Sequence, residues 1–343
     1  MGRILFYPSG DPKAGYGHVT RCSALADELA ARGHEPVFVC RAAYAPTLEY
    51  LAGLGQAVLT LNSTGPATND LAAIGRLIGE RKFTWLVADT YEIDGVWTAS
   101  AHYLADKVAV IDDLADRYLD CDLLLNQNLG FNEAYEVLVP PATIKLLGPD
   151  YALLRRPFIE ARAKGSPRSG RLARILIFMG GNDGADYTAQ AIRAAAGLEA
   201  EVELDVVVGP DYSYIGDLHG LLDEISTPAT LYHGASAEEM ADLMARADLC
   251  IGAAGSTSWE RCCLGLPSIL LVIADNQRSV GDQLAALGAA VSVYPNGESL
   301  EVVIAKVLDD LFDNAERLKL MSAKAASLVD GKGTERVASE MLG

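Results

Sequence analysis

The sequence predicts an α/β protein made of two doubly wound, Rossmann-like domains, and three observations support this fold class. Short apolar, β-rich runs alternate with amphipathic helical stretches, which is typical of parallel sheets covered by helices. The 343 residues exceed the usual size of one hydrophobic core. A basic stretch containing Gly, Ser and Pro at residues 161–173 interrupts the alternation, which restarts at residue 174. The alternative is a single sheet of about a dozen strands, more than open sheets usually carry.

The apolar runs of the first half define its elements in order. Strands are expected over residues 3–7, 35–40, 57–61, 85–89, 108–111 and 123–126. Helices are expected over residues 19–31, 45–54, 69–81 and 95–105. Gly33 supplies a stop between the first helix and the second strand. We therefore expect a first domain over residues 1–160.

The second half repeats the same alternation. Strands are expected over residues 174–179, 203–208, 230–233, 249–251, 268–272 and 290–293. The last segment, residues 299–342, has a helical pattern and no strand to cover. We expect a second domain over residues 170–343 that ends in a closing C-terminal helix and faces the first domain across a cleft.

The charge balance limits the classes of partner. The chain has 28 Lys plus Arg against 46 Asp plus Glu, a formal net charge of −18. This excess argues against a nucleic-acid surface or a polybasic membrane contact. An anionic ligand would therefore have to be held by local backbone dipoles and a few placed side chains. No nucleic-acid partner is expected, and the oligomeric state is left open.

Apolar runs and cysteines indicate the compartment and exclude some cofactors. No apolar run approaches the roughly 20 residues of a membrane span, and the N-terminus enters a strand at once, without a signal peptide. The cysteines form no Cys-x-x-Cys pair and lie at no zinc-ligand spacing from a histidine. We expect a cytoplasmic protein with buried thiols, no metal site and no cofactor. The six cysteines are Cys22, Cys40, Cys121, Cys250, Cys262 and Cys263.

Two glycine-marked loops are the strongest functional signal. One, residues 15–21, follows the opening strand, and the other, residues 252–260, follows the strand at 249–251. Each leads from a buried strand through a tight turn into a helix, where free backbone N–H groups and the helix dipole favour an anion. The spacing of the first loop does not fit a dinucleotide fingerprint. Two such loops suggest two domains that bind one phosphorylated ligand.

The first loop places a histidine at a helix start. Gly15 and Gly17 clear space around His18, and the helix dipole favours the neutral imidazole that a general base requires. His18 could instead only cap the helix. Arg21 lies one turn further on and faces either the same site or solvent.

Three later strands of the first half end in polar residues. Asp89 and Tyr91 follow the fourth strand and could orient a sugar hydroxyl or a water, or form a helix-capping turn. Asp112 and Asp113 follow the next strand, and adjacent aspartates point in opposite directions, so at least one is expected to be structural. Asn126, with its neighbouring amides at 127–128, ends the sixth strand and suits sugar hydroxyls. Ligands of open α/β sheets bind at these strand ends.

The second half offers candidate nucleotide contacts. Paired glycines before Asp183 would let a diphosphate approach the backbone closely. Glu260 could accept a ribose diol or could complete a capping box with Thr257. A later strand end carries two amides that could face the site. The candidate nucleotide-binding residues are Gly180, Gly181, Asp183, Gly255, Ser256, Thr257, Glu260, Asn276 and Gln277.

Taken together, these motifs resemble the UDP-2,4-diacetamido-2,4,6-trideoxy-β-L-altropyranose hydrolase family of pseudaminic acid biosynthesis. They run in order over nearly the whole chain. The resemblance rests on Gly15-x-Gly17-His18-x-x-Arg21-Cys22-x-x-Leu25-Ala26, Asp89-x-Tyr91, Ile111-Asp112-Asp113, Cys121-Asp122-Leu123-Leu124-Leu125-Asn126-x-Asn128, Gly148-x-x-Tyr151-Ala152-Leu153-Leu154-Arg155, Met179-Gly180-Gly181-x-Asp183, Ser256-x-x-Trp259-Glu260 and Ala274-x-Asn276-Gln277.

The resemblance implies a glycosyltransferase-B-like architecture and a metal-independent hydrolysis of a UDP-sugar with inversion at the anomeric carbon. It implies that His18 is the catalytic base, that Tyr91 belongs to the sugar site and that Glu260 contacts the nucleotide. The first strand departs from the family, because residues 6–10 read Phe-Tyr-Pro-Ser-Gly where an Arg-x-Asp-x-Ser-like sequence is common.

Three other functions remain open at this point. A glycosyltransferase would pass the sugar from a UDP-sugar to a soluble acceptor on the same scaffold. A nucleotide-sugar binding module would bind without turnover, which His18 in its cleared loop argues against. A non-hydrolysing epimerase is the weakest alternative, because its further carboxylates are not identifiable here.

Overall fold

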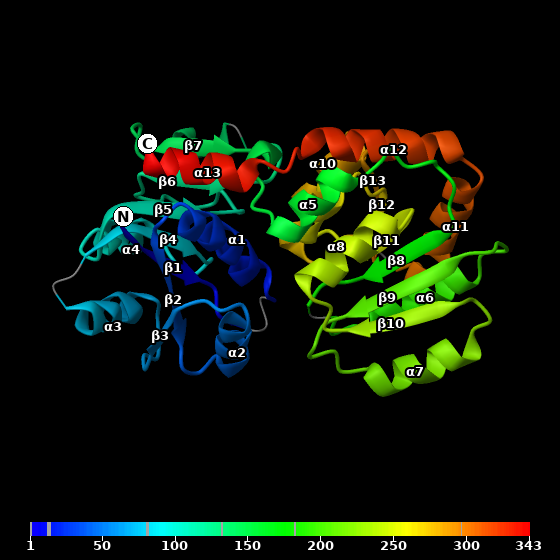
Figure 1. The fold of residues 1–343 in the computed structure, drawn as a ribbon, viewed down its shortest axis with the longest axis horizontal. Helices are drawn as coiled ribbons and strands as arrows, with labels where there is room; N and C mark the ends of the chain where they lie inside the picture. The colour runs from blue at the N-terminus through cyan, green and yellow to red at the C-terminus, as the bar shows by residue number, and fades with distance from the viewer. Residues whose placement is uncertain (1, 12–14, 80–81, 132, 182, 296) are drawn as a thin grey trace. The chain divides into compact units, whose positions relative to one another are not determined.

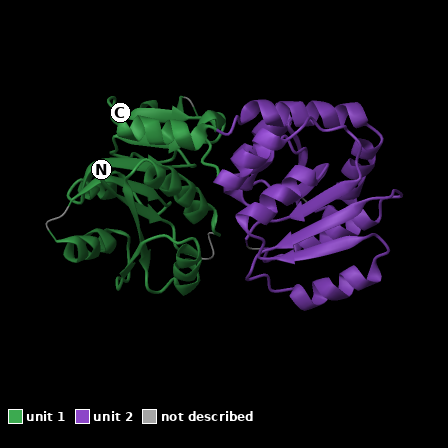
Figure 2. Cartoon of the chain, in the orientation of Figure 1, with its two compact units in different colours: residues 1–155, 332–343 green, residues 156–331 purple. Residues whose placement is uncertain are grey.

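The computed structural model of the chain describes all residues except 1, 12–14, 80–81, 132, 182 and 296. It divides into two compact units (Figure 2). Unit 1 contains residues 1–155 and 332–343, and unit 2 contains residues 156–331. In each unit the strands form one parallel sheet, which confirms the predicted class of two α/β domains.

The sheet of unit 1 has the strand order β3-β2-β1-β4-β5-β6-β7. The first half contributes six strands near the expected positions, and the seventh, β7, lies at the edge of the sheet and was not predicted. The strands are β1 (Arg3–Pro8), β2 (Glu35–Arg41), β3 (Val58–Leu61), β4 (Phe83–Asp89), β5 (Ala105–Ile111), β6 (Leu123–Asn126) and β7 (Ile144–Leu147).

Helices of unit 1 cover both faces of this sheet (Figure 1). They are α1 (Gly17–Ala31), α2 (Ala45–Gly53), α3 (Thr68–Ile78), α4 (Gly95–Ala101) and α13 (Gly333–Leu342), with short 3-10 turns η2 (Ala134–Glu136) and η3 (Pro149–Tyr151). Two helices are shorter than predicted: α4 stops before residue 105, where β5 begins, and α3 ends at Ile78. The predicted end of that helix, at residues 80–81, lies outside the described residues.

The sheet of unit 2 has the order β10-β9-β8-β11-β12-β13, and all its strand pairs are parallel. The strands are β8 (Arg174–Phe178), β9 (Glu203–Val208), β10 (Ala229–His233), β11 (Leu249–Ala253), β12 (Ser268–Leu271) and β13 (Ala290–Val293). The helical elements are α5 (Arg156–Lys164), α6 (Tyr187–Ala196), α7 (Ile215–Glu224), α8 (Ala237–Arg246), α9 (Thr257–Cys263), η4 (Asp275–Gln277), α10 (Arg278–Ala286), α11 (Leu300–Phe312) and α12 (Ala315–Leu328).

Alternation along the central strands fills a core on each side of each sheet. In β1, Ile4 and Phe6 join one cluster, whereas Leu5 and Tyr7 join the cluster on the opposite face. Parallel strands covered on both faces read as continuous apolar runs, which is why the sequence predicted them. Because helices cover both faces of each sheet, a ligand binds at the loops that follow the carboxyl ends of the strands.

The C-terminal segment differs from its expected position. Helix α13 belongs to unit 1, where it packs beside α1 (Figure 1), whereas the sequence placed it in the second domain. Its Val337 and Met341 are buried in the core of unit 1, and Trp85 Nε1 donates to the carbonyl oxygen of Met341 at 2.9 Å. Helix α11 also differs, because its Ile304 and Leu308 pack into the core against the sheet of unit 2.

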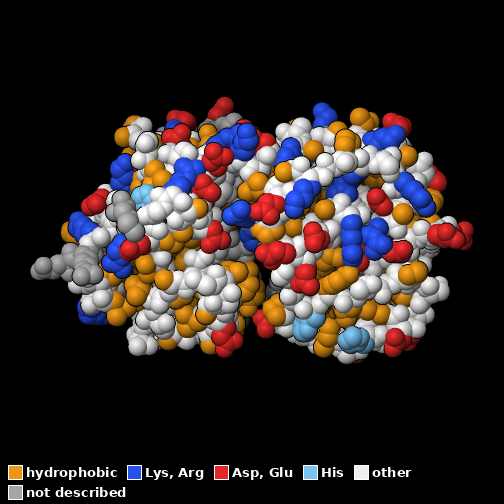
Figure 3. Space-filling model, viewed as in Figure 1, with side chains coloured by type: hydrophobic (Ala, Val, Ile, Leu, Met, Phe, Trp, Pro, Cys, Tyr) orange, Lys and Arg blue, Asp and Glu red, His pale blue; other side chains and the backbone are white. Residues whose placement is uncertain are grey.

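Two surface observations complete the fold. Within the described residues, no helix is long and apolar enough to cross a membrane. On the face drawn in Figure 3, acidic and basic side chains are interspersed over both units.

Candidate functional site

The candidate site of unit 1 lies at the switch point of its sheet. Strands β1 and β4 are neighbours there, although the chain leaves β1 toward one side of the sheet and returns to β4 from the other. His18 is in the first turn of α1, which follows β1, and Asp89 is the last residue of β4. Gly15 has φ +75°, a left-handed conformation that favours glycine and turns the chain into α1. Doubly wound sheets bind their ligands at this crevice.

His18 and Asp89 form a buried pair. His18 Nδ1 lies 2.7 Å from Asp89 Oδ1, and the two residues are 7% and 0% exposed. A carboxylate at this distance holds the proton on Nδ1 and leaves Nε2 as the basic nitrogen. The sequence expected the helix dipole to keep the imidazole neutral. The structure adds a carboxylate that would stabilise the imidazolium once a proton is taken up.

Arg21 fixes the orientation of the pair. Its Nε and Nη2 donate to the two oxygens of Asp89, both at 2.6 Å, and Nη2 also donates to Asp113 at 2.8 Å. Burial raises the pKa of Asp89, but the Arg21 guanidinium and His18 outweigh it and hold that pKa well below its usual range. Arg21, which the sequence placed either at this site or toward solvent, lies at the site and joins the two carboxylates.

Three further side chains surround the pair. Asp113 accepts hydrogen bonds from Arg21, from the Tyr91 hydroxyl at 3.1 Å and from Asn128 Nδ2 at 2.8 Å. The rings of Tyr91 and His18 meet edge to face, with their centroids 5.0 Å apart. The structure thus brings Gly17, His18, Arg21, Asp89 and Tyr91 together, five residues that the sequence selected one by one. It also brings in Asp113 and Asn128, which the sequence marked only as polar residues after two strands and as parts of the resemblance motifs.

Two polar residues beside the site are structural. The Asn126 side chain donates to the Tyr135 hydroxyl and accepts from the backbone N–H of Asn128, so both of its polar atoms are used within the protein. Asp112 accepts from the backbone of Ala115 and from Tyr135. This confirms the expectation that one of the adjacent aspartates would be structural.

In unit 2, the glycine-marked segment at the end of β11 is closely packed at Gly252 and open at Gly255. Gly252 is packed so closely that a Cβ atom there would collide with the carbonyl oxygen of Phe178 and with Arg261 Nη1. Gly255, at the tip, has open space where a Cβ would lie. Ser256 and Thr257 are the residues at the start of α9, and Glu260 lies buried one turn inside it. The Ser256 side chain, at the N-cap position of α9, makes no cap hydrogen bond.

Arg261 was missed by the sequence reasoning. It is 1% exposed, and its Nη2 donates to the carbonyl oxygen of Ala253 at 2.6 Å and to Ser258 Oγ at 2.8 Å. A buried guanidinium under the turn holds its two ends together and adds positive charge close to it. In the sequence, Arg261 is a helical residue next to Glu260, and no local pattern indicates that it holds the turn together.

The end of β8, next to β11 in the sheet, carries the second pair of glycines. Gly180 has φ +101°, and Gly181 follows it on the same turn. Asp183 does not point to a ligand: its carboxylate accepts from the backbone N–H of Tyr187 and Thr188 and from Thr188 Oγ1. Asp183 therefore binds the first N–H groups of α6, whose N-cap residue is Asp186, and its carboxylate is not left free for the nucleotide contact expected.

Of the two amide side chains that follow β12, one is exposed and the other is bound within the protein. Asn276 is exposed on the turn η4, whereas Gln277 Oε1 accepts from the backbone N–H of Ile273 at 3.1 Å. Asn276 is the one of the two that is available to a ligand. Elsewhere, across the part of the chain that the structure describes, no group of three or more His, Cys, Asp or Glu is placed to hold a metal ion.

The two glycines of the β11–α9 turn allow a matched test. Gly252→Ala is expected to lower the free energy of unfolding by about 1–3 kcal/mol, because the new methyl group meets backbone and Arg261. Gly255→Ala is expected to leave the unfolding midpoint unchanged, because no atom lies within 4 Å of the added methyl group. If the turn holds a diphosphate, as the sequence predicts, the same methyl group should weaken UDP binding about tenfold. Urea unfolding and calorimetry measure both. Equal effects of the two variants on stability would contradict this assignment.

Comparison with known families supports the fold and its class. Residues 175–338 match the Glycosyltransferase family 28 C-terminal domain. The crystal structure of MurG from Acinetobacter baumannii superposes with a TM-score of 0.67, at 17% identity, over 100% of this chain and 99% of that chain. The chain therefore has the glycosyltransferase-B fold.

Sequence relatives cover less of the chain. The uncharacterized protein MJ1062 of Methanocaldococcus jannaschii is 23% identical over 293 residues, which cover 82% of this chain and 57% of that protein. A UDP-N-acetylglucosamine–N-acetylmuramyl-(pentapeptide) pyrophosphoryl-undecaprenol N-acetylglucosamine transferase of Methylococcus capsulatus is 38% identical over 110 residues, which cover 31% of each chain. The chain thus spans about half the length, or less, of these relatives.

Proposed function

We propose that this chain is a glycosyltransferase that uses a nucleotide-sugar, with UDP as the nucleotide and His18 as the general base. The buried pair of His18 Nδ1 and Asp89 Oδ1 at the switch point of unit 1 carries this proposal. A histidine held in one tautomer by a carboxylate is the arrangement that takes a proton from an attacking hydroxyl.

In the proposed reaction, an acceptor hydroxyl attacks the anomeric carbon of the donor sugar. His18 Nε2 takes the hydroxyl proton, and Asp89 stabilises the resulting imidazolium. The bond between the anomeric carbon and the UDP oxygen breaks, and UDP leaves with the electron pair. A single displacement of this kind inverts the anomeric centre.

The nucleotide is assigned to unit 2. Backbone N–H groups near Gly255 and Ser256, at a helix start, suit the developing charge on the departing diphosphate. Arg261 beneath the turn adds a fixed positive charge. Glu260 is proposed to accept the ribose hydroxyls.

Glu260→Ala is expected to weaken UDP binding about 10–100-fold, because hydrogen bonds to a charged group contribute about 1.5–3 kcal/mol. The rate at saturating donor should change much less. Calorimetry with UDP and steady-state kinetics separate the two effects. Glu224→Ala, at an exposed glutamate of the same unit, is the control. Unchanged affinity for UDP in Glu260→Ala would refute the ribose role.

Hydrolysis of a UDP-sugar is the second candidate, with water in place of the acceptor hydroxyl. It is favoured by the gathering of His18, Tyr91 and Asp113 at one place, because these residues carry the resemblance to the UDP-sugar hydrolases. Transfer is preferred, since the family match of residues 175–338 and the Methylococcus relative are both to glycosyltransferases.

The deciding experiment follows a panel of UDP-sugars by NMR in oxygen-18 water, with and without added acceptor sugars. Transfer predicts a new glycoside only when acceptor is present, with UDP released in equal amount. Hydrolysis predicts free sugar of inverted configuration that carries solvent oxygen. Tight binding of the UDP-sugar without either product would favour a binding module instead.

A further inference from the structure

The basic stretch at residues 161–173 has no role in the proposed reaction, although the sequence singled it out. It contains four basic side chains and no acidic one, in a chain whose formal net charge is −18. In the structure it includes the end of α5 and the connection to β8. Its basic residues are Arg162, Lys164, Arg168 and Arg171. Two of them, Arg162 and Arg168, bind backbone carbonyl groups at the ends of helices in unit 2.

Arg168 joins the C-terminal ends of two helices. Its Nη2 donates to the carbonyl oxygen of Met244 at 2.8 Å and its Nη1 donates to that of Ala247, both at the end of α8. Its Nε donates to the carbonyl oxygen of Gly265 at 2.9 Å, and its Nη2 also donates to that of Leu264 at 3.3 Å, directly after α9. A guanidinium group carries its N–H donors in a rigid planar fork, so one side chain can bind both helix ends at once.

Arg162 binds the last residue of α9. Its Nη1 donates to the carbonyl oxygen of Cys263, and its Nη2 donates to that of Ala326, in α12, at 3.2 Å. The last carbonyl groups of a helix have no partner inside it, and the helix dipole favours a cation at that end. Burial lowers the pKa of Arg168 to about 10, so this guanidinium is still charged at pH 7. The two arginines therefore supply donors and positive charge at the C-terminal end of α9.

Helix α9 depends on contacts of this kind. It has seven residues, and isolated helices this short are not stable in water. Its end packs closely on α12, because a Cβ atom at Gly265 would lie 3.2 Å from the carbonyl oxygen of Ser322. The Ser322 hydroxyl also donates to the carbonyl oxygen of Gly265 at 2.7 Å. With Arg261 under the turn at its other end, α9 is held at both ends by arginine side chains.

These contacts reach Glu260 through one turn of helix. The N–H of Leu264 donates to the carbonyl oxygen of Glu260 at 3.2 Å, and the carbonyl oxygen of Leu264 accepts from Arg168. Glu260 is 6% exposed, so neighbouring atoms restrict how far its side chain can move to compensate for a shift of its backbone. Binding groups have to be held within about 0.5 Å of their productive positions. A displacement of the end of α9 would therefore be felt at the Glu260 carboxylate.

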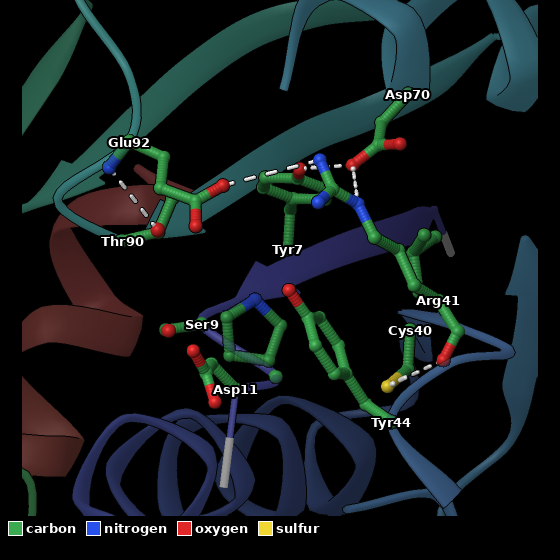
Figure 4. A pocket seen from close by; sticks show the side chains of 12 residues that line it. Tyr7, Ser9, Asp11, Cys40, Arg41, Tyr44, Asp70, Thr90 and Glu92 are labelled. Carbon is green, nitrogen blue, oxygen red and sulfur yellow. Dashed lines mark hydrogen bonds and ion pairs between the residues drawn. The ribbon is translucent and has the colours of Figure 1, made fainter. Parts of the chain in front are cut away.

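Other arginines of the chain bind in a different way. Figure 4 shows Arg41 of unit 1 beside Asp70, to which its Nε donates at 2.9 Å. In unit 2, Arg174 Nη1 lies 3.3 Å from Asp205 Oδ2. Such ion pairs join two side chains, whereas the two arginines of the basic stretch bind the backbone and so fix the path of the chain itself. Arg174 is for this reason a suitable control for them.

We propose that Arg162 and Arg168 are positioning residues for the nucleotide site, because they hold α9, and with it Glu260, in the place from which Glu260 binds UDP. The inference rests on the proposed function, which assigns the ribose hydroxyls to Glu260. It gives the basic stretch a role inside unit 2. It also implies that lysine cannot replace arginine here, since an ammonium group has no planar fork with which to bind two helix ends.

Calorimetry with UDP tests this role in variants that keep the positive charge. Arg168→Lys is expected to bind UDP about tenfold more weakly than wild type, and Arg162→Lys, which affects fewer contacts, about threefold more weakly. Arg174→Lys changes an arginine of the same unit that pairs with Asp205, and should bind UDP as wild type does. A urea unfolding curve of each variant shows that binding is measured on folded protein.

Fluorine NMR of protein labelled with 5-fluorotryptophan separates positioning from a general loss of stability. The chain has three tryptophans, of which Trp259 lies in α9 beside Glu260, whereas Trp85 and Trp97 lie in unit 1. Arg168→Lys should shift the resonance of Trp259 and leave the other two in place. Arg174→Lys should shift none of the three. This measurement needs no ligand, so it reports on α9 independently of UDP.

The outcomes separate this inference from the proposed function. Weaker UDP binding by Arg168→Lys together with a shifted Trp259 resonance supports the positioning role. UDP affinity equal to wild type in both Arg162→Lys and Arg168→Lys, or an equal loss in Arg174→Lys, would overturn that role and leave the proposed function standing. Failure of the wild-type protein to bind UDP would instead overturn the proposed function, and the nucleotide role of the two arginines with it.

Discussion

Replacement of His18 by asparagine is expected to reduce turnover about 10²–10⁴-fold while UDP still binds, because general-base catalysis contributes a factor of this size. The asparagine amide can still hydrogen-bond to Asp89 but cannot accept a proton from the attacking hydroxyl. The effect should fall on the rate at saturating substrate, since in the proposed reaction the imidazole acts in the transition state. Steady-state kinetics on the UDP-sugar identified by NMR would measure it.

A matched control keeps this result interpretable. His102→Asn changes a partly exposed histidine of the same unit, 4.0 Å from Asp122, and should leave turnover unchanged. Calorimetry with UDP and a urea unfolding curve would show that the His18 variant is folded and binds nucleotide. Turnover within tenfold of wild type in His18→Asn would exclude His18 as the base.

Asp89→Asn is expected to have the largest effect on stability. It removes a fully buried charge that Arg21 and His18 both contact, and breaking a buried ion pair costs about 3–5 kcal/mol. The asparagine would also allow the wrong histidine tautomer, so turnover should fall even where the protein is folded. Urea unfolding followed by tryptophan fluorescence measures the first effect, and the same kinetic assay measures the second.

The same substitution should change how stability depends on pH. Because the folded protein lowers the pKa of Asp89, the ionised carboxylate contributes stability above the ordinary value of about 4. That contribution is lost as the pH falls below 4 toward the folded pKa. Wild type should therefore lose more stability than Asp89→Asn between about pH 5 and pH 3. Asp106→Asn, at an exposed position, should follow the wild-type curve, and parallel curves for wild type and Asp89→Asn would contradict the buried pair.

The fold was predictable because buried parallel strands leave a strong local signature. The unpredicted strand, β7, has four residues, includes Lys145 and lies at the sheet edge. Only Leu146 in it is fully buried, so the strand lacks the apolar run by which the central strands were recognised. The position of α13 was not predictable for another reason. Val337 and Met341 mark an apolar face, but nothing local says which sheet that face covers.

The site was predictable in part. His18 and Asp89 were found because glycines and strand ends are local features. Their pairing was not, because the contact between His18 and Asp89 spans 71 residues of sequence. Asp183 shows the opposite error: an acidic residue after paired glycines reads as a ligand contact, yet a helix start competes for the same carboxylate.

The position of α13 also has a consequence for how the protein is made. Unit 1 is encoded by the first 155 residues together with the last 12, so unit 2 is in effect inserted into it. During synthesis, residues 1–155 emerge from the ribosome before unit 2, but Trp85 and the α1 face stay uncovered until α13 is released. The whole of unit 2 can fold in that interval. Unit 1 is thus started before unit 2 and completed after it, and a nascent chain stalled before residue 332 would present its incomplete core to chaperones.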